Sequence, residues 1–118
     1  MSAAVIKRRL LIDNSNSGLE ATSTKRAIRY GLRMKKAGHK TVLIIGAEAK
    51  NVCDGIDPEA LAPLAEDVAL DDVVVVGDQM HTSRVNVVRS SDLESALRAA
   101  LTLTKERDVI ISCVKMWR

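Results

Sequence analysis

Thr41-Val42-Leu43-Ile44-Ile45-Gly46 is the stretch of sequence that decides the fold class. It is a continuous apolar run that stops at a glycine, and apolar and polar side chains do not alternate along it. Such a run is typical of a strand that is buried on both faces of a parallel sheet. Val73-Val74-Val75-Val76 has the same character and ends at Gly77. The two runs predict two interior strands of an α/β protein.

Further strands are predicted on both sides of these runs. Residues 10–12 predict the first strand and residues 109–111 the last, because each is a short apolar run bounded by polar residues. Residues 85–88 predict a weak, short strand at an edge of the sheet.

Helical patterns separate the predicted strands. The first helix is expected over residues 22–36, with Gly38 as its stop. Pro63 would interrupt a helix that began at Asp57-Pro58, so we expect a short turn there and a helix from near Pro63 onward. The third helix is expected to run from the capping box Ser91-Asp92-Leu93-Glu94, with Ser91 as N-cap, to about Lys105.

Strands that alternate with helices predict a three-layer α/β/α sandwich with a Rossmann-like, mainly parallel sheet. The chain has 118 residues, and we expect residues 1–118 to form a single domain. In such sheets, ligands bind beside the carboxyl ends of the strands. The loops that follow the predicted strands are therefore the places to look for function.

Composition excludes several classes of protein. Hydrophobic residues make up 47% of the chain and charged residues 28%, which excludes a disordered chain. With no Phe, one Tyr and one Trp, the chain lacks the aromatic platforms of single-strand nucleic-acid binding proteins. No apolar run approaches the ~18 residues that span a bilayer. The two cysteines predict no disulfide framework, so we expect a cytoplasmic protein without nucleic-acid or membrane partners.

Two kinds of site have no signature in the sequence. There is no P-loop and no G-x-G-x-x-G fingerprint, so the chain has no recognisable cradle for a nucleoside triphosphate. Cys53, Cys113, His39 and His81 contain no pair at the close spacing of metal ligands, so no metal site is predicted.

Polar and flexible residues gather where the predicted strands end. A strand-end site would combine hydroxyls, amides, carboxylates and mobile lysine charges, which suit an anionic or nucleotide ligand. Asx and Ser side chains also favour turns, so a purely structural role stays open for the first loop. The candidate binding residues are Asp13, Asn14, Ser15, Asn16, Ser17, Gly46, Lys50, Asp78, Ser112 and Lys115.

The first predicted helix carries cations and no acid. A solvated face explains this pattern, and so does contact with an anionic substrate or with a neighbouring acidic domain. Basic charge alone gives nucleic acid only a salt-sensitive, non-specific affinity. The residues are Lys25, Arg26, Arg29, Arg33, Lys35 and Lys36.

The strand ends resemble those of the C-terminal domain of the Mur ligase family, which includes muramyl peptide ligases and folylpolyglutamate synthetases. In that family a strand ends in an Asp-led motif before a helix, and Leu11-Ile12-Asp13-Asn14-Ser15-Asn16-Ser17-Gly18 is similar, with Asp13 at the aspartate. Residues 44–50 resemble a strand that runs into G-G-D-G-K, with Lys50 at the lysine. Residues 73–78 and 107–112 resemble two further strands of the family.

The resemblance implies the C-terminal domain of an ATP-dependent ligase that activates a carboxylate as an acyl phosphate and forms an amide or carbon bond. ATP and Mg²⁺ would be bound mainly by a central domain that carries a P-loop. The C-terminal domain would close over ATP, and alone it would be inactive. The implied partners are a small-molecule carboxylate and the N-terminal and central domains. The resemblance also places the last strand between the first and second.

The chain departs from the family pattern in one informative place. The D-N-P-R element that some muramyl ligases use for their amino-acid substrate is Asp78-Gln79-Met80-His81 here, which argues against a peptidoglycan precursor. The form of residues 13–18 is closer to Mur-ligase-like proteins of methanogenic archaea. The acid is left open between a peptidoglycan precursor, a folate-like compound and a tetrapyrrole. A stand-alone module for a small anion, or a protein-interaction domain, is the alternative function.

Overall fold

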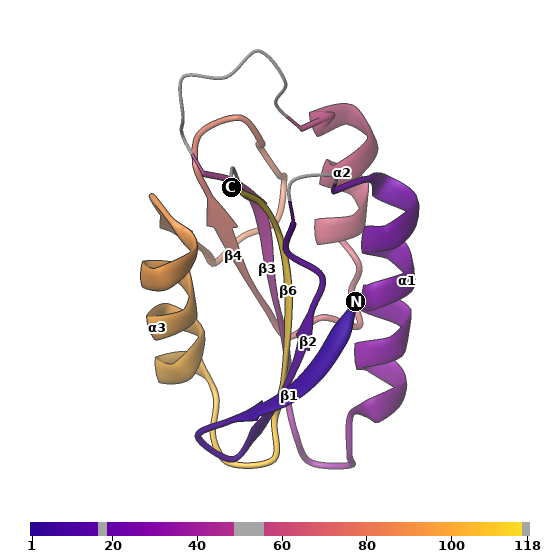
Figure 1. The fold of residues 1–118 in the computed structure, drawn as a ribbon, viewed down its shortest axis with the longest axis vertical. Helices are drawn as coiled ribbons and strands as arrows, with labels where there is room; N and C mark the ends of the chain where they lie inside the picture. Colours follow the sequence, from indigo (N-terminus) through magenta and orange to yellow (C-terminus); the bar gives the residue numbers. More distant parts are fainter. Residues whose placement is uncertain (17–18, 49–55, 117–118) are drawn as a thin grey trace.

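Six strands form one sheet in the order β1-β2-β6-β3-β4-β5 (Figure 1). The computed structural model describes residues 1–16, 19–48 and 56–116. β1 is antiparallel to β2, and all other neighbours are parallel. The strands are β1 (Ser2–Ile6), β2 (Arg9–Asp13), β3 (Thr41–Ala47), β4 (Asp72–Val76), β5 (Val87–Ser90) and β6 (Val109–Lys115).

Helices cover both faces of the sheet (Figure 1). α1 (Ala21–Met34) and α2 (Pro58–Ala65) pack on the face that presents Leu43, Val75 and Ile111. α3 (Leu93–Leu103) packs on the other face, against alternate residues of the same strands. None of the described helices is long and apolar enough to cross a membrane. The protein is therefore an α/β protein with a mixed, mainly parallel sheet between two helical layers.

The interior of the sheet agrees with the sequence-based expectation. Residues 41–47 of β3 and Val73–Val76 of β4 are fully buried, as continuous apolar runs predict. β6 lies between β2 and β3, so the predicted placement of the last strand is confirmed. β5 is an edge strand, as expected, although it starts two residues later than predicted.

β1 and its hairpin were not predicted from the sequence. β1 is almost entirely exposed, so it carries no apolar periodicity that would mark it as a strand. Its turn to β2 is formed by Lys7 and Arg8, both with positive φ (45° and 64°), where Asn-Gly is the usual signal. The strand has no buried face and the turn has no glycine, so neither element has a signal that sequence reasoning recognises.

Two predicted helix starts were wrong. α2 begins at Pro58, with the Asp57 carboxylate accepting a hydrogen bond from the Ala60 backbone N–H (3.3 Å). Pro63 removes one backbone hydrogen bond from α2 but is tolerated there, because Leu61 and Ala65 of the helix are buried in the core. In α3 the N-cap residue is Asp92 rather than Ser91, and its carboxylate accepts from the Ser95 N–H (2.8 Å).

Two arginines from outside the helices, Arg9 of β2 and Arg84 of the loop before β5, cap the carboxyl ends of α3 and α2. α2 and α3 have no basic residue in their last turns. Arg9 donates to the carbonyl oxygens of Leu101 (3.3 Å) and Thr104 (2.7 Å), which end α3. Arg84 donates to the carbonyl oxygens of Ala65 and Asp67 (3.3 and 2.9 Å), which end α2. These contacts satisfy carbonyls that a helix leaves unpaired.

Asp108 organises the loops at the amino edge of the sheet. Its buried carboxylate accepts hydrogen bonds from the backbone N–H groups of Lys40 (3.0 Å) and Lys105 (2.9 Å), and it contacts His39 Nδ1 (3.0 Å). Burial alone would raise the pKa of Asp108, but these hydrogen bonds and the attraction of His39 outweigh burial and hold the pKa below its usual value.

Asp108→Asn should destabilise the protein, because an amide N–H would then face a backbone N–H. We expect the free energy of unfolding to fall by about 2 kcal/mol at neutral pH. The carboxylate stabilises the fold fully above its unfolded pKa, near 3.8, and this stabilisation is lost as pH falls through the lower folded pKa. The difference between variant and parent should therefore shrink below about pH 4 in denaturant titrations. A difference that stays constant at acid pH contradicts this account.

Thr41, in contrast to Asp108, has a buried polar group that forms no hydrogen bond with the described residues. Its hydroxyl is the buried side-chain polar atom without a hydrogen-bond partner in the described part of the chain. Thr41→Val keeps the shape and removes the unpaired group, so thermal and denaturant unfolding should show equal or higher stability, by up to about 1 kcal/mol. The matched control is Thr24→Val, since the buried Thr24 hydroxyl donates to the Glu20 carbonyl (2.8 Å) and its removal should cost about 1 kcal/mol. Equal losses in both variants would refute the prediction.

Candidate functional site at the carboxyl edge of the sheet

The loop after β2 continues to pair with β6 beyond the end of the strand. Asn14 N–H donates to the Ser112 carbonyl (2.8 Å), and Asn16 N–H donates to the Val114 carbonyl (3.1 Å). Between them, Val114 N–H donates to the hydroxyl of Ser15 (2.9 Å). A serine side chain thus takes part in the strand pairing. The loop is held in place along its first three residues.

Asp13, Ser15 and Ser112 form one connected polar group. Asp13 and Ser112 are paired across β2 and β6, as predicted from the strand order. The Asp13 carboxylate accepts the Ser15 N–H (3.0 Å), and the Ser15 and Ser112 hydroxyls share a hydrogen bond of 2.7 Å. Ser112 is buried. The Ser15 and Ser112 hydroxyls therefore hold the loop against β6.

Asn14 points toward the core beneath α1. It is buried, and its amide donates to the Ser23 hydroxyl (3.3 Å). Next to it lies Cys113, whose burial raises its pKa to about 12, despite opposing hydrogen bonds from Asn14 and Thr24. A thiol with this pKa is protonated at neutral pH and is a poor nucleophile. Asn14 and Cys113 belong to the packing of the fold.

Asn16, Lys115 and Glu48 lie at the outer margin of this group. Asn16 is exposed, and it pairs with Lys115, the partly buried last residue of β6. Lys115 also lies opposite Ala47 of β3, and its carbonyl accepts the Glu48 N–H (3.1 Å). The backbone pairing thus places Asn16, Lys115 and Glu48 next to one another at the ends of β2, β6 and β3.

Gly46 has a packing role. It lies inside β3, paired with Val114, with a φ of 137°. A Cβ there would come within 2.2 Å of the Val76 carbonyl oxygen of β4. Gly77 likewise would place a Cβ 2.2 Å from the Ala47 carbonyl. The two glycines let the ends of β3 and β4 approach closely.

The expected adjacency of Ser112 and Gly46 was wrong. The prediction ended the last strand at residue 111, but β6 continues to Lys115, and Ser112 pairs with Ile44 of β3. Gly46 therefore lies two residues further along the sheet than Ser112. The cause is that Ser112 and Cys113 interrupt the apolar run in the sequence without interrupting the strand.

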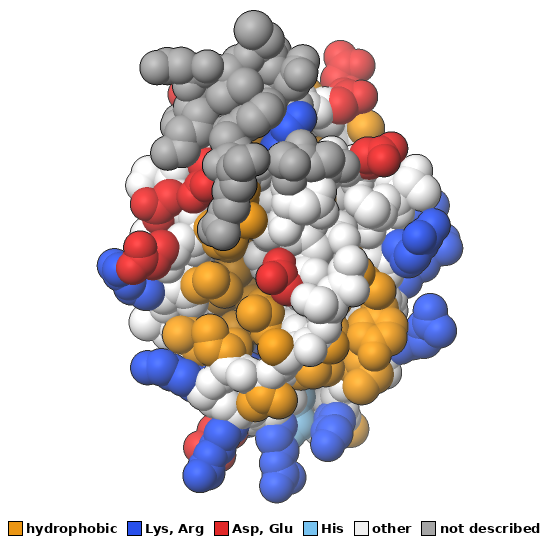
Figure 2. All heavy atoms as spheres, viewed as in Figure 1, with side chains coloured by type: hydrophobic (Ala, Val, Ile, Leu, Met, Phe, Trp, Pro, Cys, Tyr) orange, Lys and Arg blue, Asp and Glu red, His pale blue; other side chains and the backbone are white. Residues whose placement is uncertain are grey.

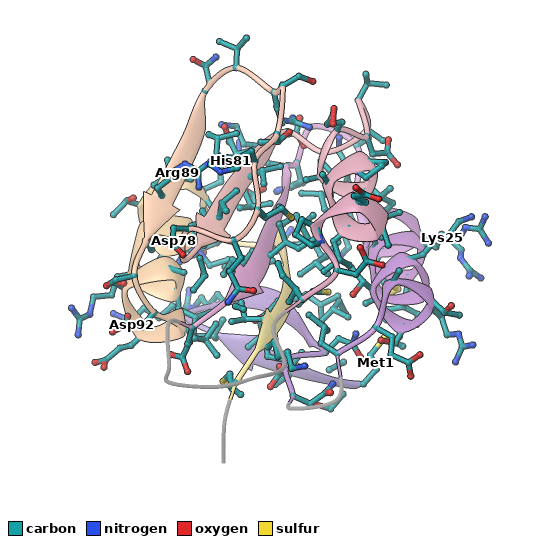
Figure 3. The ribbon with its side chains drawn as sticks, turned by 90° about the horizontal axis from the view of Figure 1, so that it is seen from above. Met1, Lys25, Asp78, His81, Arg89 and Asp92 are labelled. Atoms are coloured by element: carbon teal, nitrogen blue, oxygen red, sulfur yellow. The ribbon has the colours of Figure 1, made fainter. Side chains whose placement is uncertain are left out.

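Asp78 lies apart from this group, in a hollow at the ends of β4 and β5. The hollow is about 360 Å³ in volume and is lined by Gly77, Asp78, Arg89, Ser90 and Ser91. Arg89 of β5 donates to the Met80 carbonyl (3.2 Å), and Gly77 N–H donates to the Ser90 carbonyl (2.8 Å). Seen from above in Figure 3, Asp78, His81 and Arg89 gather over these two strands. A hollow of this size with a carboxylate, a guanidinium and hydroxyls suits a small polar group.

The sequence reasoning missed Arg89, Ser90 and Ser91. They directly follow the predicted strand over residues 85–88, so the rule used for the other strand ends would have found them. Glu48 was also missed; its carboxylate accepts the Leu93 N–H at the start of α3 (3.1 Å). Two predicted site residues, Ser17 and Lys50, lie outside the residues that the structure describes.

Acidic side chains predominate at this edge. Figure 2 shows acidic side chains toward the upper end of the molecule and basic ones along the lower end. The described cations at the strand ends are Arg89 and Lys115, and the field of the surrounding acids disfavours a bare phosphate. The described carboxylates at or just beyond the strand ends are Asp13, Glu20, Glu48, Asp57, Asp78 and Asp92.

These acids do not converge on a metal site. Within residues 1–16, 19–48 and 56–116, no group of three or more His, Cys, Asp or Glu side chains is placed to hold a metal ion. His39 instead contacts Asp108 at the opposite edge of the sheet.

Two comparisons with known proteins agree with each other on the family of this chain. A curated coenzyme F(430) synthetase from Methanosarcina acetivorans is 33% identical to the chain over 114 residues, which are 92% of this chain and 24% of the relative. The chain thus spans about a quarter of the length of that relative. No solved structure matches the chain. The family model described as "Coenzyme F430 synthetase CfbE, C-terminal domain" matches residues 4–116. Because this match covers nearly the whole chain, the chain belongs to the family of coenzyme F430 synthetase C-terminal domains.

Proposed function

We propose that residues 1–118 act as the C-terminal domain of a cytoplasmic, ATP-dependent ligase of the Mur type that makes coenzyme F430. The observation that carries the proposal is the family match over residues 4–116. The substrate would be a carboxylate of the F430 precursor, a tetrapyrrole. This domain would complete the active site when it closes on the domain that binds ATP.

The carboxyl edge of the sheet is better suited to closing over ATP that is already bound than to binding free ATP itself. The chain has no P-loop, so ATP and Mg²⁺ would be held mainly by a central domain of the longer polypeptide. Acidic side chains at the edge would repel free ATP but would tolerate ATP whose phosphates already carry Mg²⁺. The domain would then contact ATP that already carries Mg²⁺ on the central domain, and would not bind free ATP from solution.

The polar group of β2 and β6 would give the closing edge its rigidity. Ser15 links Asp13, Ser112 and Val114 in one hydrogen-bonded unit. Groups that are already fixed lose little conformational freedom when they meet a transition state. Asn16 and Lys115 lie at the outer end of this unit.

Lys115 is the described cation best placed to act on substrate. It ends β6, the central strand of the edge, between Asn16 and Ala47. An ammonium there would stabilise the negative charge that develops as a carboxylate is activated as an acyl phosphate. Lys50 is proposed for the same task from sequence alone.

The hollow at β4 and β5 would hold a second polar group of the substrate. Arg89 supplies a guanidinium beside Asp78, although the D-N-P-R element of some muramyl ligases is replaced here. An arginine that is partly fixed by the Met80 carbonyl suits a carboxylate. Tetrapyrroles that carry several carboxylates would present such groups.

In the intact ligase, Lys115→Met should lower kcat about 100-fold and change KM little, because the charge is needed mainly in the transition state. The matched control is Lys105→Met, an exposed lysine that directly follows α3 at the amino edge, and it should leave kcat unchanged. Steady-state ligation assays measure both variants, and thermal unfolding checks that both fold. Equal kcat in Lys115→Met and the parent would remove Lys115 from the mechanism.

Residues 1–118 alone should show no ATP hydrolysis, because the phosphate cradle is missing from their sequence. A phosphate-release assay on the pure domain tests this, with the intact ligase as positive control. Turnover above background that copurifies with the domain would contradict the assignment of ATP binding to another domain.

A further inference from the structure

The outer surface of α1 and β1 combines exposed apolar side chains with a cluster of cations. Four of the six large apolar side chains exposed in the described residues lie on α1, on β1 or directly before it: Met1, Val5, Tyr30 and Met34. Val5, Leu10, Met34 and Val109 line a hollow of about 240 Å³ between the end of α1 and the β1–β2 hairpin. Exposed apolar side chains that gather in one place mark an interaction surface.

Cations surround this hollow. Arg8, Lys36 and Arg107 complete its lining. Arg8 and Arg107 both have positive φ (64° and 73°), and Arg107 N–H donates to the Arg8 carbonyl (2.8 Å), which holds the two residues side by side. The nearest acid is Glu106, 3.5 Å from the Arg8 guanidinium. The rim is therefore strongly positive.

The exposed face of α1 extends the positive rim along the helix. Arg26, Arg29 and Arg33 are exposed and form no ion pair with any described residue, whereas Lys35 pairs with Asp71 (3.3 Å). At 100° per residue, Tyr30 and Met34 lie on the flank of α1 next to these arginines. Met, Tyr and Arg are the residues that protein interfaces favour.

We propose that this surface, Val5, Arg8, Arg29, Arg33, Met34 and Arg107, docks an acidic protein segment with an apolar side chain that enters the hollow. The hollow is too small for a drug-sized ligand but matches one side chain. A purely phosphate-binding surface would need cations alone, so the apolar floor favours protein over nucleic acid. Charge complementarity requires the segment to be acidic.

The occupant we assign is the polypeptide that precedes this domain in its longer relatives. The inference rests on the proposed function only in that this chain acts as the C-terminal part of a longer protein. Met1 is exposed and lies on the α1 side of the molecule in Figures 1 and 3, at the end of β1 away from the hollow, so a preceding polypeptide would run back along β1 and α1 to reach the hollow.

The test mixes two purified polypeptides: residues 1–118 and the part of the same protein that precedes them. Calorimetry should detect binding that weakens about tenfold or more when salt is raised from low to high ionic strength. Arg29→Glu with Arg33→Glu should weaken binding at least tenfold and reduce its salt dependence. Met34→Ser should weaken binding without changing the salt dependence. The control is Arg98→Glu on α3, an exposed arginine on the other face, which should bind like the parent.

Several results would overturn the proposal. The first two are absence of binding between the two polypeptides, and a control variant, Arg98→Glu, that weakens binding as much as the α1 variants do. The third is tighter binding of residues 1–118 to a DNA duplex or to phosphatidylglycerol vesicles. The fourth is a dimer of residues 1–118 that the charge reversals dissociate. Thermal unfolding shows whether each variant is folded. Ligase activity of the intact protein is measured separately: activity without docking refutes only this inference, and docking without activity refutes only the proposed function.

Discussion

The structure depends on the insertion of β6 between β2 and β3. β6 is paired along its whole length with β3 and over Val109–Ser112 with β2. Without β6, the hairpin of β1 and β2 would have no connection to the rest of the sheet. The buried carboxylate of Asp108 anchors the start of β6 by binding the loops that lead into β3 and out of α3. The Ser15 hydroxyl secures the other end, where Val114 donates to it.

The two edges of the sheet have different chemistry. The carboxyl edge has acids, glycines that permit close strand approach, and a loop fixed by serine hydroxyls. The amino edge and the outer face of α1 have mostly cations. An acidic edge with only a few cations suits a domain that contacts a nucleotide whose phosphates already carry Mg²⁺ and which is bound by another domain. A basic, partly apolar flank suits attachment to the remainder of a longer protein.

The interior of the fold could be predicted, whereas of its two edge strands only β5 could. Apolar runs revealed β3 and β4 because burial on both faces leaves a continuous pattern. β1 escaped prediction because it is exposed, and the start of α2 escaped because Pro63 suggested a break that tertiary packing overrides. At the site, strand order correctly paired Asp13 with Ser112. Residue types could not show that Ser15 and Ser112 would bond to each other, since this depends on the distance between strands. Arg89, in contrast, follows the predicted strand over residues 85–88 and could have been found by the strand-end rule.

The central position of β6 also affects how the protein is made. Synthesis proceeds from the amino terminus, so β2 and β3 emerge from the ribosome long before the strand that separates them. Until residue 109 follows, both strands have an unpaired edge that could join the wrong neighbour. A premature stop shortly before residue 109 would remove the middle of the sheet rather than its margin, although most of the domain would already have been made.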